Sequence, residues 1–307
     1  MAYVESVKLE GTFLPVTTAF DPVTGDVDYV AFGANLRRWF ASPISGILIS
    51  GSTGESVFLD EGERAGLIRE ARAIAPDGAF VIAGTGAEAS RHTIRLTQQA
   101  AEAGADAVLV SPPAYFKGAM TREALIGHYQ AVADASPVPV LLYQVPLRLS
   151  TIEFSTSLVA TLSEHPNIIG IKDSRGEIDL LVQLVEESID GFQVLTGSGS
   201  VLYPALKLGA AGGIVAVGLM AADKAANIAI AFQEGRHEEA KKLQDEIAPV
   251  NQSIVGGMGV PGIKAALNLL GFHGGVPRSP LMPASGLQVE EIREILEAAD
   301  LLEDIRA

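Results

Sequence analysis

One short stretch of the sequence, NIIGIKDS (167–174), places Lys172 near the end of an apolar, strand-like run. Burial disfavours the charged ammonium group and therefore lowers the pKa of a lysine. A neutral amine is a nucleophile that condenses with a ketone to give an imine, and the protonated imine is an electron sink for C–C bond cleavage or formation. The alternative is structural, with Lys172 paired to Asp173 or to another acid at a strand end.

Tyr143 is the second candidate, because it lies toward the end of the preceding apolar run, VPVLLYQVP (138–146). A phenol next to an imine-forming lysine can move protons during imine formation and C–C chemistry. The alternative is a core aromatic residue whose hydroxyl group bonds to the backbone.

Hydroxyl groups and glycines in GSTGES (51–56) and an arginine at 148 offer donors to an anionic substrate. Ser52, Thr53 and the backbone N–H groups of a Gly-rich turn suit an anion, and Arg148 can hold a carboxylate in bidentate fashion. The alternatives are an ordinary tight turn and a surface arginine. The stretch TGSGS (196–200) is similar to the phosphate loops of some barrels, but it lacks the Lys-Ser/Thr of a P-loop.

Eight apolar runs, separated by polar helix-like segments, must position these residues. The runs are continuous rather than alternating, as expected for parallel strands buried on both faces. They cover residues 12–20, 46–50, 79–86, 106–112, 138–146, 167–174, 192–199 and 212–218. This pattern predicts a (β/α)₈ (TIM) barrel with its functional groups at the C-terminal strand ends, and an open doubly wound sheet is the alternative.

After about residue 220 the strand-like runs stop. Helical stretches follow near 221–235, 237–254, 258–271 and 289–303, and no Pro-, Gly- or Ser-rich linker precedes them. We therefore expect a barrel over 1–220 that contains the site, and a C-terminal helical extension over 221–307 packed on it.

Composition excludes several classes of function. The net charge of −15 argues against nucleic acid as a partner. The 307 residues contain no cysteine, which rules out disulfides, a thiolate nucleophile and Cys-ligated metal. None of the five histidines is at metal-ligand spacing from another. They are His92, His128, His165, His237 and His273. We expect no metal, no signal peptide, no membrane span and a cytoplasmic location.

Nearly end to end, the chain resembles the dihydrodipicolinate synthase / N-acetylneuraminate lyase family of Schiff-base-forming 2-oxo acid aldolases. The resemblance rests on GSTGES (51–56), YQVP (143–146) and GIKDS (170–174), which fall at predicted strand ends in the family's order. Other segments look most like the 4-hydroxy-2-oxoglutarate aldolase type, among them LSEHPNIIGIKDS and GVPGIKAALNLLGFHGG. GSTGES and Arg148 lean toward dihydrodipicolinate synthase, and sugar-acid aldolases and dehydratases remain open.

The resemblance assigns roles to individual residues. It implies that Lys172 forms the imine, that Tyr143 shuttles protons, and that Ser52 and Thr53 supply the hydroxyl pair, with serine in place of the synthase branch's usual threonine. Tyr115, which follows Ala114 where the family has paired tyrosines, would reach into a neighbouring subunit's site. The implied substrate-binding set is Thr53, Gly51, Arg148 and Val215, although LST after Arg148 departs from the synthase pattern.

The expected activity is a lyase or aldolase reaction on pyruvate or a pyruvate-derived 2-oxo acid, with no cofactor and in a homodimer or homotetramer. The best match is 4-hydroxy-2-oxoglutarate aldolase, which works with pyruvate and glyoxylate. The alternative is 4-hydroxy-tetrahydrodipicolinate synthase, which works with pyruvate and aspartate semialdehyde. Two other classes are a metal-dependent aldolase that uses Glu55 or Asp173, and a non-catalytic 2-oxo acid binding protein.

Overall fold

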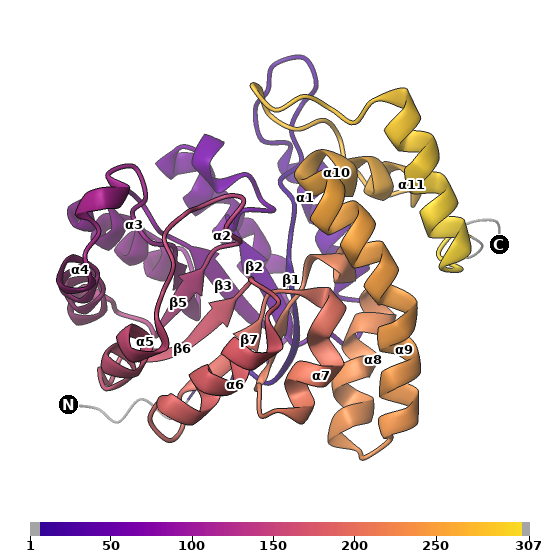
Figure 1. Cartoon of the computed structure of the whole chain (residues 1–307). Helices are drawn as coiled ribbons and strands as arrows, with labels where there is room; N and C mark the ends of the chain where they lie inside the picture. The colour runs from indigo at the N-terminus through magenta and orange to yellow at the C-terminus, as the bar shows by residue number, and fades with distance from the viewer. Residues whose placement is uncertain (1–6, 303–307) are drawn as a thin grey trace.

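Eight parallel strands close into a barrel in simple chain order, from β1 beside β2 round to β8 beside β1 (Figure 1). The computed structural model describes residues 7–302. Its strands are β1 Gly11–Pro15, β2 Gly46–Ile49, β3 Phe80–Gly84, β4 Ala107–Val110, β5 Val140–Gln144, β6 Ile168–Asp173, β7 Gln193–Thr196 and β8 Gly212–Ile214. The predicted TIM barrel is confirmed, and the open doubly wound sheet is excluded.

Each strand buries both of its faces, which explains why the apolar runs do not alternate. In β2, Leu48 packs in a cluster inside the barrel, whereas Ile47 and Ile49 pack in the larger cluster between the barrel and its helices. The strands are shorter than the apolar runs that predicted them. The last residues of each run lie in the loop after the strand, where a barrel carries its functional groups.

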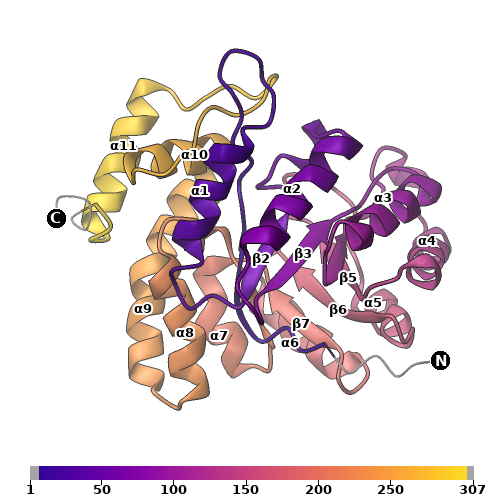
Figure 2. The same cartoon turned by 180° about the vertical axis from the view of Figure 1, so that it is seen from behind.

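A helix follows each strand and covers the outside of the barrel (Figure 2). These helices are α1 Tyr29–Trp39, α2 Glu61–Ile74, α3 Ser90–Glu102, α4 Arg122–Ala135, α5 Thr156–Ser163, α6 Ile178–Glu187, α7 Leu202–Lys207 and α8 Ala222–Gln233. Several begin at side-chain caps written in the sequence. Asp60 and Glu63, for example, form a capping box that fixes the start of α2.

The C-terminal extension consists of α9 His237–Val250, a π-helical segment η5 Asn251–Met258, α10 Gly259–Leu269 and α11 Gly286–Ala298. It packs on one flank of the barrel, coloured orange to yellow in Figures 1 and 2. Pro249 lies just before η5 and has no N–H to donate, a recognised cause of irregular helix geometry.

The division of the chain at residue 220 stays a prediction. Thr12 of β1 donates a hydrogen bond to the carbonyl of Ala225 in α8, so we propose to count α8 with the barrel. Residues 1–6 and 303–307, which fall in the predicted barrel and extension, lie outside the described residues. Within residues 7–302, no helix combines the length and the hydropathy that crossing a membrane requires.

A buried ion pair ties the extension to the loop after β2. Lys264 of α10 places its Nζ 2.6 Å from Glu55 Oε1, and the two side chains are 1% and 0% exposed. The same Nζ donates to the Val276 carbonyl, and the backbone N–H of Arg278 donates to Glu55 Oε2. Because Glu55 follows Ser52 and Thr53 closely, the extension helps to hold the turn that carries them.

We expect His128 to make the fold acid-sensitive. It is buried in α4, its Nδ1 lies 2.9 Å from Ser90 Oγ, and burial lowers its pKa to about 4. Below about pH 6.5, His128 is protonated in the unfolded chain but stays neutral in the folded chain. The free energy of unfolding should therefore fall by up to about 3 kcal/mol between pH 6.5 and 4. Urea unfolding across this range should show a shallower pH slope for His128→Asn, and an unchanged slope would contradict this assignment.

Candidate active site

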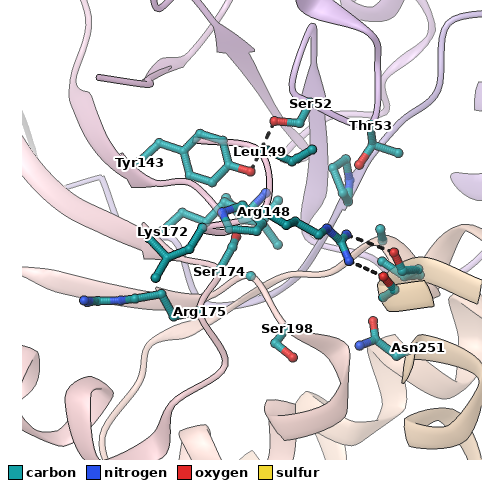
Figure 3. A pocket seen from close by; sticks show the side chains of 18 of the residues that line it. Ser52, Thr53, Tyr143, Arg148, Leu149, Lys172, Ser174, Arg175, Ser198 and Asn251 are labelled. Atoms are coloured by element: carbon teal, nitrogen blue, oxygen red, sulfur yellow. Dashed lines mark hydrogen bonds between the residues drawn. The ribbon is translucent and has the colours of Figure 1, made fainter. Parts of the chain in front are cut away.

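A cavity of about 370 Å³ opens at the C-terminal ends of the strands and is lined by most of the predicted site residues (Figure 3). Ser52, Thr53, Tyr143, Arg148 and Lys172 all lie in its wall. They come from the ends of β2, β5 and β6 or from the loops that follow. The barrel topology brings these strand ends to one rim, as its parallel order requires.

Lys172 lies in the cavity wall with only 5% of its surface exposed. It pairs in register with Tyr143 of the neighbouring strand, and its Nζ lies 4.7 Å from the centroid of the Tyr143 ring. Burial lowers the pKa of the Lys172 ammonium, and the charge interaction with Tyr143 opposes part of that shift. Burial thus shifts this amine toward its neutral, nucleophilic form.

The expected structural partner of Lys172 is engaged elsewhere. Asp173 points to the other face of β6, where its Oδ2 accepts a hydrogen bond of 3.0 Å from Arg175 Nε. No salt bridge among residues 7–302 includes Lys172. The alternative of a Lys172–Asp173 ion pair is therefore wrong.

Tyr143 and Ser52 face each other across the cavity, with 3.4 Å between their hydroxyl oxygens (Figure 3). Thr53 lines the same cavity beside Ser52. Gly51 lies one residue earlier and lines a second, smaller cavity whose wall also includes Ser52 and Tyr143. The hydroxyl pair predicted from GSTGES is therefore at the site, with a phenol in contact and an amine close by.

Arg148 lines the cavity, but its guanidinium group donates to the backbone carbonyls of Val255, at 3.0 Å, and Gly256 in η5 (Figure 3). Both terminal nitrogens are thereby used to hold the extension against the loop after β5. These two contacts occupy the face of the guanidinium group that would bind a carboxylate in bidentate fashion. Carboxylate binding by Arg148 therefore stays a prediction, and it would require these two hydrogen bonds to break.

Val215 and Tyr115 lie outside the cavity. The Val215 side chain packs in the outer core between barrel and helices, while its neighbours Ile214 and Ala216 line the cavity. Since side chains alternate along extended backbone, a shift of one residue separates the two faces. Tyr115 is 80% exposed and packs edge-on against Phe116.

Sequence reasoning missed several residues of the cavity wall. Those from strand ends are Ser174, Arg175, Glu177 and Ser198, and those from η5 are Asn251, Val255 and Gly256. The stretches KDS and TGSGS had marked two of these positions as polar strand ends. The η5 residues gave no local signal, because only the packing of the extension brings them to the rim.

The carboxylates named for a metal-dependent reaction do not fit a metal site. Glu55 is paired with Lys264, and Asp173 is paired with Arg175 on the outer face of β6. Within residues 7–302, no three His, Asp or Glu side chains are grouped so as to hold an ion. A cation at either carboxylate would have to displace a buried ion pair.

Comparison with known proteins identifies the family of this chain. The sequence model described as the "Dihydrodipicolinate synthetase family" matches residues 8–299. The chain belongs to this family. It is 36% identical over 298 residues to a probable mitochondrial 4-hydroxy-2-oxoglutarate aldolase of Emericella nidulans, covering 95% of this chain and 96% of that protein. It is 33% identical to the 4-hydroxy-tetrahydrodipicolinate synthase of Mycolicibacterium paratuberculosis, covering 95% and 96% of the two chains.

Solved structures of the dihydrodipicolinate synthetase family share the fold. The dihydrodipicolinate synthase of Acinetobacter baumannii, complexed with pyruvate, has a TM-score of 0.90 at 29% identity, covering 95% of this chain and 99% of that chain. A prophage protein of the same family from E. coli, also in complex with pyruvate, has a TM-score of 0.89 at 28% identity, with coverage of 95% and 99%. The predicted resemblance is therefore confirmed, and this protein is an enzyme of the aldolase, lyase or synthase type that the family comprises.

Proposed function

We propose that this protein is a class I aldolase that binds pyruvate or a pyruvate-derived 2-oxo acid as an imine on Lys172. The observation that carries the proposal is a buried lysine that pairs with no acid among residues 7–302, in the wall of a cavity and 4.7 Å from the centroid of a tyrosine ring. A desolvated amine in such a place has a lowered pKa and is activated for attack on a ketone.

We infer 4-hydroxy-2-oxoglutarate as the substrate, cleaved to pyruvate and glyoxylate. In this mechanism Ser52 and Thr53 hold the C1 carboxylate while Lys172 attacks C2. Tyr143 gives its proton to the carbinolamine hydroxyl, which leaves as water, and the resulting phenolate takes the proton of the C4 hydroxyl group. The C3–C4 electrons move into the iminium and glyoxylate departs. Tyr143 then gives its proton to C3 of the enamine, and its phenolate takes a proton from the water that attacks the iminium and releases pyruvate.

The choice of aldehyde rests on the aldolase of Emericella nidulans, and the second candidate rests on the synthase relatives. In that candidate the enamine of pyruvate attacks aspartate semialdehyde. A sugar-acid aldolase or dehydratase would share the same first half-reaction. The first step needs no organic cofactor, because the iminium is the electron sink.

Assembly and location are also proposals. The exposed pair Tyr115 and Phe116 gives an aromatic surface that suits contact with a second copy of the chain, so we propose a homodimer or homotetramer. Glu88 supports this surface, since its carboxylate accepts hydrogen bonds from the backbone N–H groups of Ala114 and Tyr115. We propose a cytoplasmic location, although the name of the Emericella relative includes "mitochondrial".

The test is borohydride trapping of the protein with pyruvate, followed by intact mass and peptide mapping. A reduced adduct on Lys172 is the expected result. Glyoxylate release from 4-hydroxy-2-oxoglutarate is then compared with condensation of pyruvate and aspartate semialdehyde under the same conditions. No adduct from folded protein would overturn the imine mechanism, whereas an adduct with only synthase activity would overturn the choice of aldehyde.

Tyr143→Phe should separate binding from proton transfer. Tyr143 opposes the lowering of the Lys172 pKa by burial, so its removal should lower that pKa further. Imine formation, which needs the neutral amine, should then reach its plateau at a lower pH than in the wild type. Turnover should fall by about 10²-fold, the usual contribution of a positioned acid or base. Rapid trapping over a pH series and steady-state assays provide the two measurements.

A further inference from the structure

A second cavity, of about 30 Å³, adjoins the main cavity and shares two wall residues with it, Ser52 and Tyr143. Ser50 and Ser111 also line it. Ser56 and Arg64 belong to the wall as well, so the wall carries five hydroxyl groups and one guanidinium group. A space of at least about 10–15 Å³ with several polar neighbours suffices for one ordered water, so this cavity is large enough and polar enough to hold one.

Ser50 makes this cavity unusual. The residue follows β2 directly and is 2% exposed, and its Oγ has no hydrogen-bond partner among the described protein groups. Its φ of 53° lies in the left-handed region, which favours glycine. A buried hydroxyl without a partner and a strained backbone are both unfavourable for the fold. Such features persist in native proteins mainly at functional sites.

The direct contact between Ser52 and Tyr143 is only a weak hydrogen bond to the tyrosine oxygen. Their oxygens are 3.4 Å apart, whereas a good O–H···O hydrogen bond spans about 2.5–3.0 Å. A water in the small cavity would bridge polar groups that are too far apart to bond well directly.

We propose that the small cavity holds a catalytic water, bound by Ser50 Oγ, that donates a hydrogen bond to the Tyr143 oxygen. This inference rests on the proposed function, because it assigns the group that stabilises Tyr143 between its proton transfers. When Tyr143 gives its proton to the carbinolamine hydroxyl, which leaves as water, the bound water donates a hydrogen bond to the phenolate. This hydrogen bond stabilises the phenolate until it takes the proton of the C4 hydroxyl. No proton is gained or lost over the cycle.

The test is Ser50→Gly. Glycine suits the positive φ, so the variant should fold with an unchanged or higher Tm, while the hydroxyl group that holds the water is gone. We expect kcat to fall by about 10-fold or more, a part of the acid–base contribution. We also expect an altered solvent deuterium isotope effect on kcat. Ser50→Ala, which keeps a side chain at this φ, should lose activity similarly. Ser188→Ala removes another buried hydroxyl that has no partner within residues 7–302, at the C-terminal cap of the outer helix α6, and should change neither kcat nor the isotope effect.

Borohydride trapping with saturating pyruvate distinguishes the two proposals. If both the wild-type protein and Ser50→Gly form the pyruvate adduct and only the variant turns over slowly, the result would support the catalytic water. Trapped protein with kcat and isotope effect within two-fold of the wild type would overturn the water and leave the imine intact. Failure of the wild-type protein to trap would overturn the proposed function itself. In a high-resolution crystal structure, the water should lie within hydrogen-bond distance of Ser50 Oγ, and an empty cavity would contradict it.

Discussion

Replacing Lys172 with methionine should lower turnover by at least about 10³-fold while the barrel remains folded. Nucleophile substitutions in covalent catalysis have effects of this size or larger. Methionine is similar in length but has no amine, so it keeps the packing along the apolar part of the side chain. The side chain lies in a cavity wall and pairs with no acid in the described part of the chain, so the substitution leaves no buried carboxylate there unpaired. Circular dichroism and thermal unfolding check the fold, and the steady-state assay checks turnover.

Lys264 provides an internal control for the same experiment. It too is a buried lysine, but its Nζ is held by Glu55 and by the Val276 carbonyl. Peptide mapping after borohydride reduction should find the pyruvate adduct at Lys172 and none at Lys264. An adduct that persists in Lys172→Met would assign the reactive amine to another lysine and would contradict the site described above.

The Lys264→Met substitution should lower the free energy of unfolding by about 3–5 kcal/mol, the usual result of leaving one member of a buried ion pair alone. Glu55 would keep its carboxylate in a site where both partners are at most 1% exposed. The double variant Glu55→Gln/Lys264→Met removes both charges and should recover most of the loss. Urea unfolding measures the change as a shift in midpoint at constant slope.

A surface pair calibrates this result. Lys241 and Asp245 lie one helical turn apart on α9 and are 58% and 62% exposed, so Lys241→Met should change stability by less than about 0.5 kcal/mol. Lys264→Met should also raise KM for pyruvate, because Glu55 follows the turn that carries Ser52 and Thr53. If Lys264→Met lowered the free energy of unfolding no more than Lys241→Met does, the Lys264–Glu55 pair would not hold the extension to the barrel.

Much of the site could be predicted because its main residues lie on strands. The strand pattern of β5 and β6 placed Tyr143 and Lys172 near two neighbouring C-terminal strand ends, and the parallel barrel brings such ends together. Ser52 and Thr53 could be predicted for the same reason, since they lie near the start of the loop after β2. Val215 shows the limit of this reasoning. Side chains alternate between the two faces of a strand, so an error of one residue in the alignment moves a predicted cavity residue to the outer face.

The sequence by itself determined eight parallel strands buried on both faces, through continuous apolar runs that alternate with helical segments, and it determined which strand ends carry the amine, the phenol and the hydroxyl groups. Closure of these strands into a barrel was decided by the structure, since an open doubly wound sheet has the same pattern. Tertiary structure alone decided the contacts made by the extension. Asn251, Val255 and Gly256 join the cavity wall, Arg148 binds η5, and Lys264 pairs with Glu55. These partners are about 50 to 210 positions apart, and no local propensity encodes a contact at such separation. The burial that lowers the Lys172 pKa likewise exists only in the closed barrel.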